Sequence, residues 1–291
     1  MYAVQLNGCA PAFDNSASRS SAFGKAQERR ASPASGMPGQ RFLRWILCFG
    51  MVGAPLRALE NAPSTGVREQ IPELDASSQL ILVVAESWAP GPARLRAFER
   101  RSDNWVQVGE EIRAAVGKRG AAWGIGLHGS HPANGPVKKE GDGKSPAGVF
   151  AVEELFGSRT AEEAGITRFH YRQMSASFAG VDDPNSAHYN RIVDSVVVTK
   201  DWNSAENMMP PRDLYRLGAV LRHNWHPYPG YGSCIFLHTW KGEDVPTSGC
   251  TAMAWEDLAR VLRWLDREKS PLFILLPAAE YEVRKAAWKL P

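Results

Sequence analysis

One cysteine and one histidine near the C-terminal end of the chain have types and spacing suited to chemistry. Cys250 lies in a Thr-Ser-Gly-Cys-Thr run, twelve residues after His238. A cysteine becomes a nucleophile when a base removes its proton or holds it as a thiolate–imidazolium pair. The intervening segment contains Gly242 and Pro246, so the chain can fold back there. The pair predicts nucleophilic cysteine catalysis.

The residues around Cys250 predict a site for the negative charge that such a reaction develops. Gly249 permits a close approach of the backbone. The amides of Ser248, Gly249 and Cys250, with a helix expected just beyond them, are the predicted oxyanion hole. Thr247 and Thr251 flank this turn, and we count them among the candidate oxyanion and substrate contacts.

Ordinary structural roles stay open for the other reactive side chains. A lone cysteine is most often a small buried hydrophobe, and we expect Cys234 to be a core residue, with a Cys234–Cys250 disulfide as a less favoured alternative. We expect His128 and His131 to be surface loop residues.

The remaining polar clusters also have ordinary interpretations. His223 and His226 lack partners at zinc-site spacing, so we expect no metal and no cofactor. The run 182–185 reads as a turn, and 138–140 reads as a solvated charge run, with substrate lining as the minority interpretation.

Short apolar or alternating segments separated by Gly and Pro predict strands. A hairpin signal at 102–104 separates the second strand from the third. Many short strands at close spacing predict a mainly β fold with flanking helices, of the sandwich or barrel type. The expected strands are 79–85, 94–99, 105–108, 122–127, 148–152, 195–199, 233–238 and 272–276.

Two segments predict helices, and a third is a weaker candidate. Pro211 opens the first, whose apolar stripe is Leu214, Leu217 and Leu221. The second covers about 255–267, with acidic residues in its first turn and leucines on one face. The segment 281–289 is the possible terminal helix.

The N-terminal region predicts export rather than fold. Residues 1–40 read as a disordered extension or as sequence upstream of a true start at Met37. Residues 41–62 show a basic, then an apolar, then a small-residue order, which is typical of a secretory signal, and the uncharged stretch is too short to span a bilayer. Residues 63–76 read as a linker, and 77–291 as one catalytic domain. Export would leave Cys9 and Cys48 outside the mature protein.

The composition argues against several classes of protein. The chain has 291 residues, 44% of them apolar and 22% charged, which is typical of a soluble globular protein. Its formal net charge of +3 argues against a nucleic-acid partner. We expect no stable membrane span, and we expect a monomer.

Beyond these patterns, the chain resembles the YkuD family of L,D-transpeptidases, in a proteobacterial branch. The histidine spacing that ends in Thr-Ser-Gly-Cys-Thr resembles the family signature. The segments 138–150, 181–190 and 232–238 resemble further blocks of the family in the same order. The resemblance covers most of 79–277 and implies a β-sandwich or barrel catalytic domain.

The resemblance also implies a reaction, in which Cys250 is the nucleophile and His238 its base. The substrates would be peptidoglycan stem peptides, the location the periplasm or the cell exterior, and the role cell-wall organisation and cell shape. A backbone carbonyl, rather than an acidic side chain, would orient the histidine. Two positions depart from the family pattern: Ser248 stands where a second histidine is frequent, and Ala252 where Arg or Asn is frequent.

Because of Ala252, the donor carboxylate needs another partner, for which the candidates are Lys138, Lys139, Lys241 and Arg222. Three alternatives to the transpeptidase remain open. The same site could be an L,D-carboxypeptidase, another exported cysteine hydrolase, or an inactive wall-binding domain.

Overall fold

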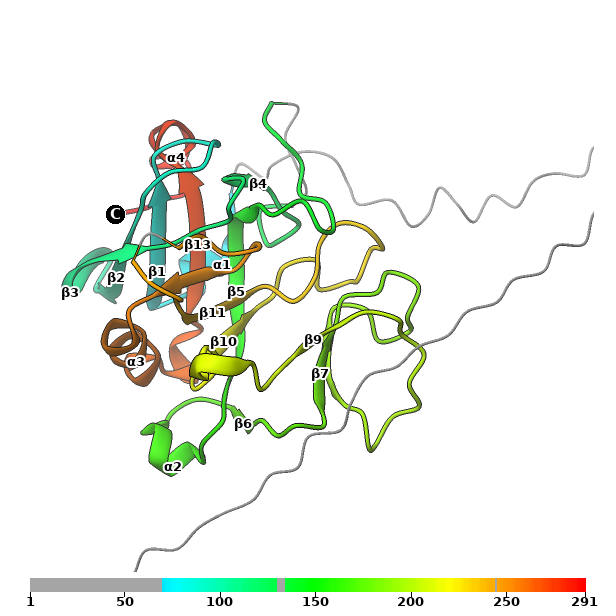
Figure 1. Cartoon of the computed structure of the whole chain (residues 1–291). Coiled ribbons are helices and arrows are strands. Elements are labelled where there is room, and N and C mark those ends of the chain that lie inside the picture. Colours follow the sequence, from blue (N-terminus) through cyan, green and yellow to red (C-terminus); the bar gives the residue numbers. More distant parts are fainter. Residues whose placement is uncertain (1–69, 130–133, 244) are drawn as a thin grey trace, which may run out of the picture. The chain divides into compact units, whose positions relative to one another are not determined.

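A computed structural model describes residues 70–129, 134–243 and 245–291, to which all structural statements refer (Figure 1). The predicted extension, signal and start at Met37 lie outside these residues. Residues 63–69 of the predicted linker, together with Cys9, Cys48 and His131, lie outside them too.

The described part is mainly β, which confirms the predicted fold class. A curled sheet has the strand order β12-β11-β10-β5-β13-β1-β2-β3, with β4 and β6 paired to β5 at its sides. A second sheet has the order β8-β7-β9. The strands are β1 (Gln79–Ala85), β2 (Ala93–Arg101), β3 (Asn104–Ala114), β4 (Ala121–Trp123), β5 (Ser145–Gly157), β6 (Tyr171–Gln173), β7 (Phe178–Val181), β8 (Arg191–Asp194), β9 (Ala205–Asn207), β10 (Gly218–Leu221), β11 (Phe236–Thr239), β12 (Thr251–Met253) and β13 (Leu272–Pro277).

The helices are short, and they are α1 (Pro72–Ala76), α2 (Ala161–Ala164), α3 (Trp255–Trp264) and α4 (Ala278–Arg284), with 3-10 turns at Pro211–Asp213 and Arg267–Lys269. The predicted helix at 255–267 is confirmed as α3, although it ends three residues early. The possible terminal helix is displaced toward the N-terminus, as α4. None of the described helices is long and apolar enough to cross a bilayer.

The centre of the core lies where β1, β13 and β5 run side by side. β1 pairs parallel with β13, and β13 pairs antiparallel with β5. A strand covered on both faces needs a continuous apolar run rather than an alternating one. Both β1 and β13 have such runs, and every residue of β13 is buried. The predicted strands 79–85 and 272–276 are therefore confirmed.

The two ends of the large sheet meet at a seam. Ala115, directly after β3, exchanges two backbone hydrogen bonds of 2.7 and 2.9 Å with Ala252 of β12. One step along, the Thr247 amide donates to the Val116 carbonyl at 2.9 Å, and the Lys118 amide donates to the Thr247 carbonyl at 2.8 Å. The sheet therefore closes on itself next to residues 247–252, which hold the predicted nucleophile.

The prediction of a helix that begins at Pro211 is wrong. Arg212 and Asp213 adopt left-handed backbone conformations, and the chain then enters β10, which pairs with both β5 and β11. Gly218 fits there because a Cβ would lie 2.5 Å from the Phe156 ring. The apolar stripe is buried as expected, but sheet pairing overrides the helical period.

The strand predicted over 195–199 is also wrong, because β8 ends at Asp194. The Asp194 side chain accepts a hydrogen bond from the Val196 amide, and its carbonyl accepts from the Val197 amide, which closes a turn. Val196 and Val197 are 78% and 79% exposed.

The predicted linker differs from the structure at its described end. α1 lies within 63–76, and Ile71 and Leu74 are buried in the main core cluster. These two apolar side chains attach the end of the segment to the body of the protein.

These positions give a test of the fold. Leu275→Ala, in the buried centre of β13, should lower the free energy of unfolding by about 2–5 kcal/mol, because it leaves a cavity. Val197→Ala should change it by less than about 0.5 kcal/mol. Chemical denaturation of the full-length chain measures both. A loss at Val197 as large as that at Leu275 would contradict the exposed turn.

Candidate active site

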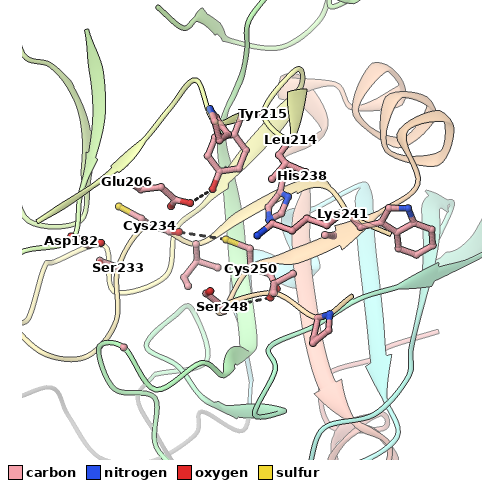
Figure 2. Close-up of a pocket in the computed structure, with 18 of the residues that line it drawn as sticks. Asp182, Glu206, Leu214, Tyr215, Ser233, Cys234, His238, Lys241, Ser248 and Cys250 are labelled. Carbon is pink, nitrogen blue, oxygen red and sulfur yellow. Dashed lines mark hydrogen bonds between the residues drawn. The ribbon is translucent and has the colours of Figure 1, made fainter. Parts of the chain in front are cut away.

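The pairing of β11 with β12 brings Cys250 and His238 to one pocket. The two strands are parallel, with His238 opposite Ala252 and Leu237 opposite Thr251. Cys250 directly precedes β12, so it is a diagonal neighbour of His238 on the same face of the sheet. Both side chains line a pocket of about 460 Å³ (Figure 2).

The turn that carries Cys250 is held by hydroxyl groups. Ser145 Oγ and Thr247 Oγ1 both donate to the Cys250 carbonyl, at 2.9 and 2.6 Å. The Gly249 amide donates to Thr247 Oγ1 at 3.1 Å. That amide is therefore already engaged, and the amides of Ser248 and Cys250 are the remaining members of the predicted oxyanion hole.

A short strand, β12, lies between Cys250 and the helix predicted from about residue 255. α3 begins only at Trp255, so its N-terminus does not continue from the Cys250 amide. The short strand was missed because Thr-Ala-Met is too brief to carry a period.

The Cys250 thiol is buried and held on two sides. Its sulfur accepts a hydrogen bond from the Phe236 amide at 3.4 Å and donates to the Cys234 carbonyl at 3.6 Å. Burial raises the pKa of the thiol far above its ordinary value, and the nearby Glu206 charge raises it further. The Phe236 amide and the Lys138 charge oppose this shift without reversing it. The resting sulfur is therefore a neutral thiol.

The His238 imidazole is fixed in one tautomer. Its Nδ1 lies 2.7 Å from the Thr239 carbonyl. A carbonyl only accepts, so Nδ1 carries the hydrogen and Nε2 carries the lone pair. Burial lowers the pKa of the imidazole; the Thr239 hydrogen bond opposes this shift, and the Lys241 charge adds to it. The ring is neutral at neutral pH and has a basic nitrogen available.

Tyr215 and Glu206 complete the pocket, and no sequence pattern pointed to either. The Tyr215 ring packs edge-on against His238, with centroids 5.3 Å apart, and its hydroxyl donates to Glu206. Burial raises the pKa of Glu206 to about 6. Tyr215 lies in the segment mistaken for a helix, and Glu206 lies on the short strand β9. Neither position has a spacing that relates it to His238.

Cys234 is buried and lies at the pocket rather than in a regular strand. Its backbone is left-handed, with φ of 51°, and its amide donates to Asn190 Oδ1 at 2.9 Å. This conformation turns its carbonyl toward Cys250. Its own thiol donates to the Val181 carbonyl at 3.6 Å. Both cysteines are free thiols.

The other predicted contacts divide into two groups. Thr247, Ser248 and Gly249 line the pocket. Thr251 does not: it is buried within β12, where strand alternation points it to the opposite face from Cys250. The Thr251 side chain is therefore not part of the pocket wall.

The cation candidates divide as well. Lys138 and Lys241 line the pocket, whereas Lys139 does not, and Arg222 lines a second pocket beside Glu153. Lys138 is only 3% exposed and pairs with Asp142 at 2.6 Å.

The expectation of a solvated charge run at 138–140 is wrong. Lys138 is buried, and the Glu140 carboxylate accepts hydrogen bonds from the hydroxyls of Tyr189 and Ser233 at the edge of the pocket. The minority interpretation, a segment that lines the substrate pocket, is the better one.

His128 is not a surface residue, because it is fully buried and accepts a hydrogen bond from the Val149 amide. His223 is buried too, between the Ile125 amide and the Tyr231 carbonyl, while His226 is exposed. The Asp183 carboxylate accepts from the Asn185 and Asn203 amides, which makes 182–185 a turn. Within the described ranges, no three His, Cys, Asp or Glu side chains gather to hold a metal ion.

Comparison with known proteins gives one match. No curated protein and no solved structure matches the chain. The family model of the YkuD L,D-transpeptidase catalytic domain matches residues 94–274, which include most strands of the large sheet, the 247–251 turn and both pocket side chains. With more than half of its length covered by this match, the chain belongs to the YkuD family of L,D-transpeptidase catalytic domains.

Proposed function

We propose that the protein is an exported cysteine L,D-transpeptidase that acts on peptidoglycan stem peptides through a thioester on Cys250. The observation that carries the proposal is the shared pocket of Cys250 and His238, in which the imidazole tautomer leaves Nε2 free. Family membership supports the substrate class, and the proposed substrate implies a location in the cell envelope.

The first half of the proposed reaction consumes the donor peptide. His238 Nε2 takes the thiol proton as Cys250 Sγ attacks the carbonyl carbon of the third stem residue. The developing oxyanion lies against the amides of Ser248 and Cys250. The histidine then gives the proton to the departing amine, the carbon–nitrogen bond breaks, and a thioester remains.

The second half resolves the thioester. An amine of a second stem peptide attacks the same carbon, which forms a new amide and returns the thiol, so that two stems become cross-linked. Attack by water on the same intermediate makes the protein an L,D-carboxypeptidase. An inactive wall-binding domain is disfavoured, because both reactive side chains are present and face one pocket.

Lys241 is the best candidate for the donor carboxylate. It lines the pocket and is exposed, and it forms no ion pair with another residue that the structure describes. Its charge reaches both His238 and Glu206. Lys138 is already paired with Asp142. We therefore assign the role left open by Ala252 to Lys241.

The buried thiol predicts a pH dependence. Because the pKa of Cys250 is raised, its thiolate fraction at neutral pH is small and grows only above the ordinary thiol pKa of about 8.5. Alkylation of the Cys250 peptide by iodoacetamide, followed by mass spectrometry, should accelerate only in that alkaline range. A midpoint below neutrality would instead demonstrate a preformed thiolate–imidazolium pair.

Two substitutions test the roles in the reaction. Cys250→Ala should abolish release of the terminal D-residue from a disaccharide-tetrapeptide, while the thermal unfolding transition is retained. His238→Ala should slow acylation by about 10²-fold, because the general base is lost. Product masses separate dimers from trimmed monomers. Full turnover by either variant contradicts the assigned role.

One further substitution tests the donor anchor. Lys241→Met should raise KM for the tetrapeptide about tenfold or more, with a smaller effect on kcat, because an ion pair that binds the ground state is removed. Lys139→Met, which removes the same charge outside the pocket, is the matched control. Equal kinetics of the two variants would remove Lys241 from the binding site.

A further inference from the structure

The pocket has two chemically different walls. Figure 2 shows Glu206 and Asp182 on one side of the Cys250 thiol, and His238 and Lys241 on the other. His238 acts on the sulfur, and Lys241 is assigned to the donor carboxylate. The carboxylate of Glu206 has no part in either step, although it lines the same pocket.

The position of Glu206 is unfavourable for the thiol chemistry alone. Its charge raises the pKa of Cys250 and so disfavours the thiolate. It would also repel the oxyanion that forms during acylation. Besides accepting the Tyr215 hydroxyl, a carboxylate beside a nucleophile of this kind favours the entry of a positive charge into the pocket.

The structure leaves one oxygen of Glu206 available for such a charge. Oε1 accepts the hydrogen bond of Tyr215. Within the part of the chain that the structure describes, Oε2 has no hydrogen-bond partner and is not among the fully buried polar atoms, and Glu206 lines the pocket. Lys241 lowers the pKa of Glu206 from nearby but forms no ion pair with it. With a pKa of about 6, Glu206 is mostly ionised at neutral pH.

Glu206 is also held in a fixed relation to the imidazole. It lies on β9, which pairs with β7, and Tyr215 packs between Phe156, Phe236 and His238 while donating to Glu206. One side chain thus orients both the carboxylate and the base.

We propose that Glu206 binds the ammonium group of the amine acceptor and so favours transfer of the acyl group to an amine over hydrolysis. The proposal rests on the function proposed above, whose amine acceptor is charged at neutral pH, and adds the residue that binds this charge. Tyr215 is a positioning residue for this contact.

The step balances as follows. The ammonium gives one proton to Glu206, and its nitrogen lone pair attacks the thioester carbon. The carbon–nitrogen bond forms and the carbon–sulfur bond breaks. The second proton lost by the nitrogen passes through His238 to the departing sulfur, which restores the Cys250 thiol, and Glu206 then releases its proton to solvent.

The test compares three nucleophiles on the same thioester, which the full-length chain forms from a disaccharide-tetrapeptide. They are butylamine, which is charged at neutral pH, hydroxylamine, which is not, and water. Glu206→Gln should slow transfer to butylamine relative to hydroxylamine by about ten- to a hundredfold, the size of a lost hydrogen bond between charged groups. Transfer to water should follow hydroxylamine.

Matched variants separate the contact from a general charge effect. Glu111→Gln removes a surface carboxylate that lies beside Arg94 and Arg96, and it should behave as wild type. Asp182→Asn removes a pocket carboxylate that is bonded to Ser204, and it should change the ratio less than Glu206→Gln. Glu206→Asp keeps the charge with a shorter reach and should give an intermediate ratio; it also carries the test if Glu206→Gln does not fold.

The outcomes are distinct. An unchanged butylamine-to-hydroxylamine ratio, or an equal loss with all three nucleophiles, overturns the role of Glu206 while leaving the proposed function intact. Failure of the wild-type chain to form a thioester from the donor overturns both proposals.

Discussion

The site depends on one constraint, the parallel pairing of β11 with β12 across a connection whose described residues, 240–243 and 245–250, form no helix. Parallel neighbours ordinarily require a long crossover, usually a helix. Here the chain returns through residues 240–250 alone, and it can do so because the seam fixes the end of the return. Ala115 and Val116 bond to Ala252 and Thr247, and two hydroxyl groups hold the Cys250 carbonyl. The hydrogen bonds that close the sheet therefore also fix the position of Cys250.

The same closure explains the electrostatic state of the site. Cys250 and His238 are both buried, at 9% and 8% exposure, so the charged form of each is disfavoured. In a thiolate–imidazolium pair, the attraction of one ion-pair contact would have to offset the large free-energy cost of desolvating both charges. The structure instead holds Cys250 as a neutral thiol and His238 as a neutral base of defined tautomer. In the proposed reaction, proton transfer then belongs to the encounter with substrate, when the attacked carbonyl accepts the developing charge.

Part of this arrangement could be predicted from the sequence, and the reason differs from element to element. β1, β13 and α3 could be predicted because burial determines their apolar patterns. The two strands are buried along continuous apolar runs, and the helix is buried along one face. β10 was missed, since the leucines that fill the core there have helical spacing by coincidence, while the backbone is set by β5 and β11. The turn after β8 was missed because three consecutive valines favour a strand wherever no side chain such as Asp194 closes a turn.

The residues of the candidate site also divide into those that could be predicted from the sequence and those that could not. Cys250 and His238 are close enough in sequence for their spacing to relate them. Tyr215 and Glu206 come from a different hairpin and a different sheet, and their contact exists only after β10 has entered the large sheet. Lys138 was misjudged for a similar reason, because its burial depends on Asp142 and on the turn around it rather than on its charged neighbours.

A last consequence concerns the choice between water and an amine as the second nucleophile. Water is small, abundant and uncharged, so a pocket that is merely accessible gives hydrolysis by default. Excluding water alone would not favour an amine, because an ammonium pays a larger desolvation cost than water on entering a buried site. A fixed negative charge offsets that cost for the ammonium and not for water. In the proposed reaction of a chain that is close to electrically neutral overall, the separation of charge within one pocket, rather than net charge, determines which nucleophile can compete.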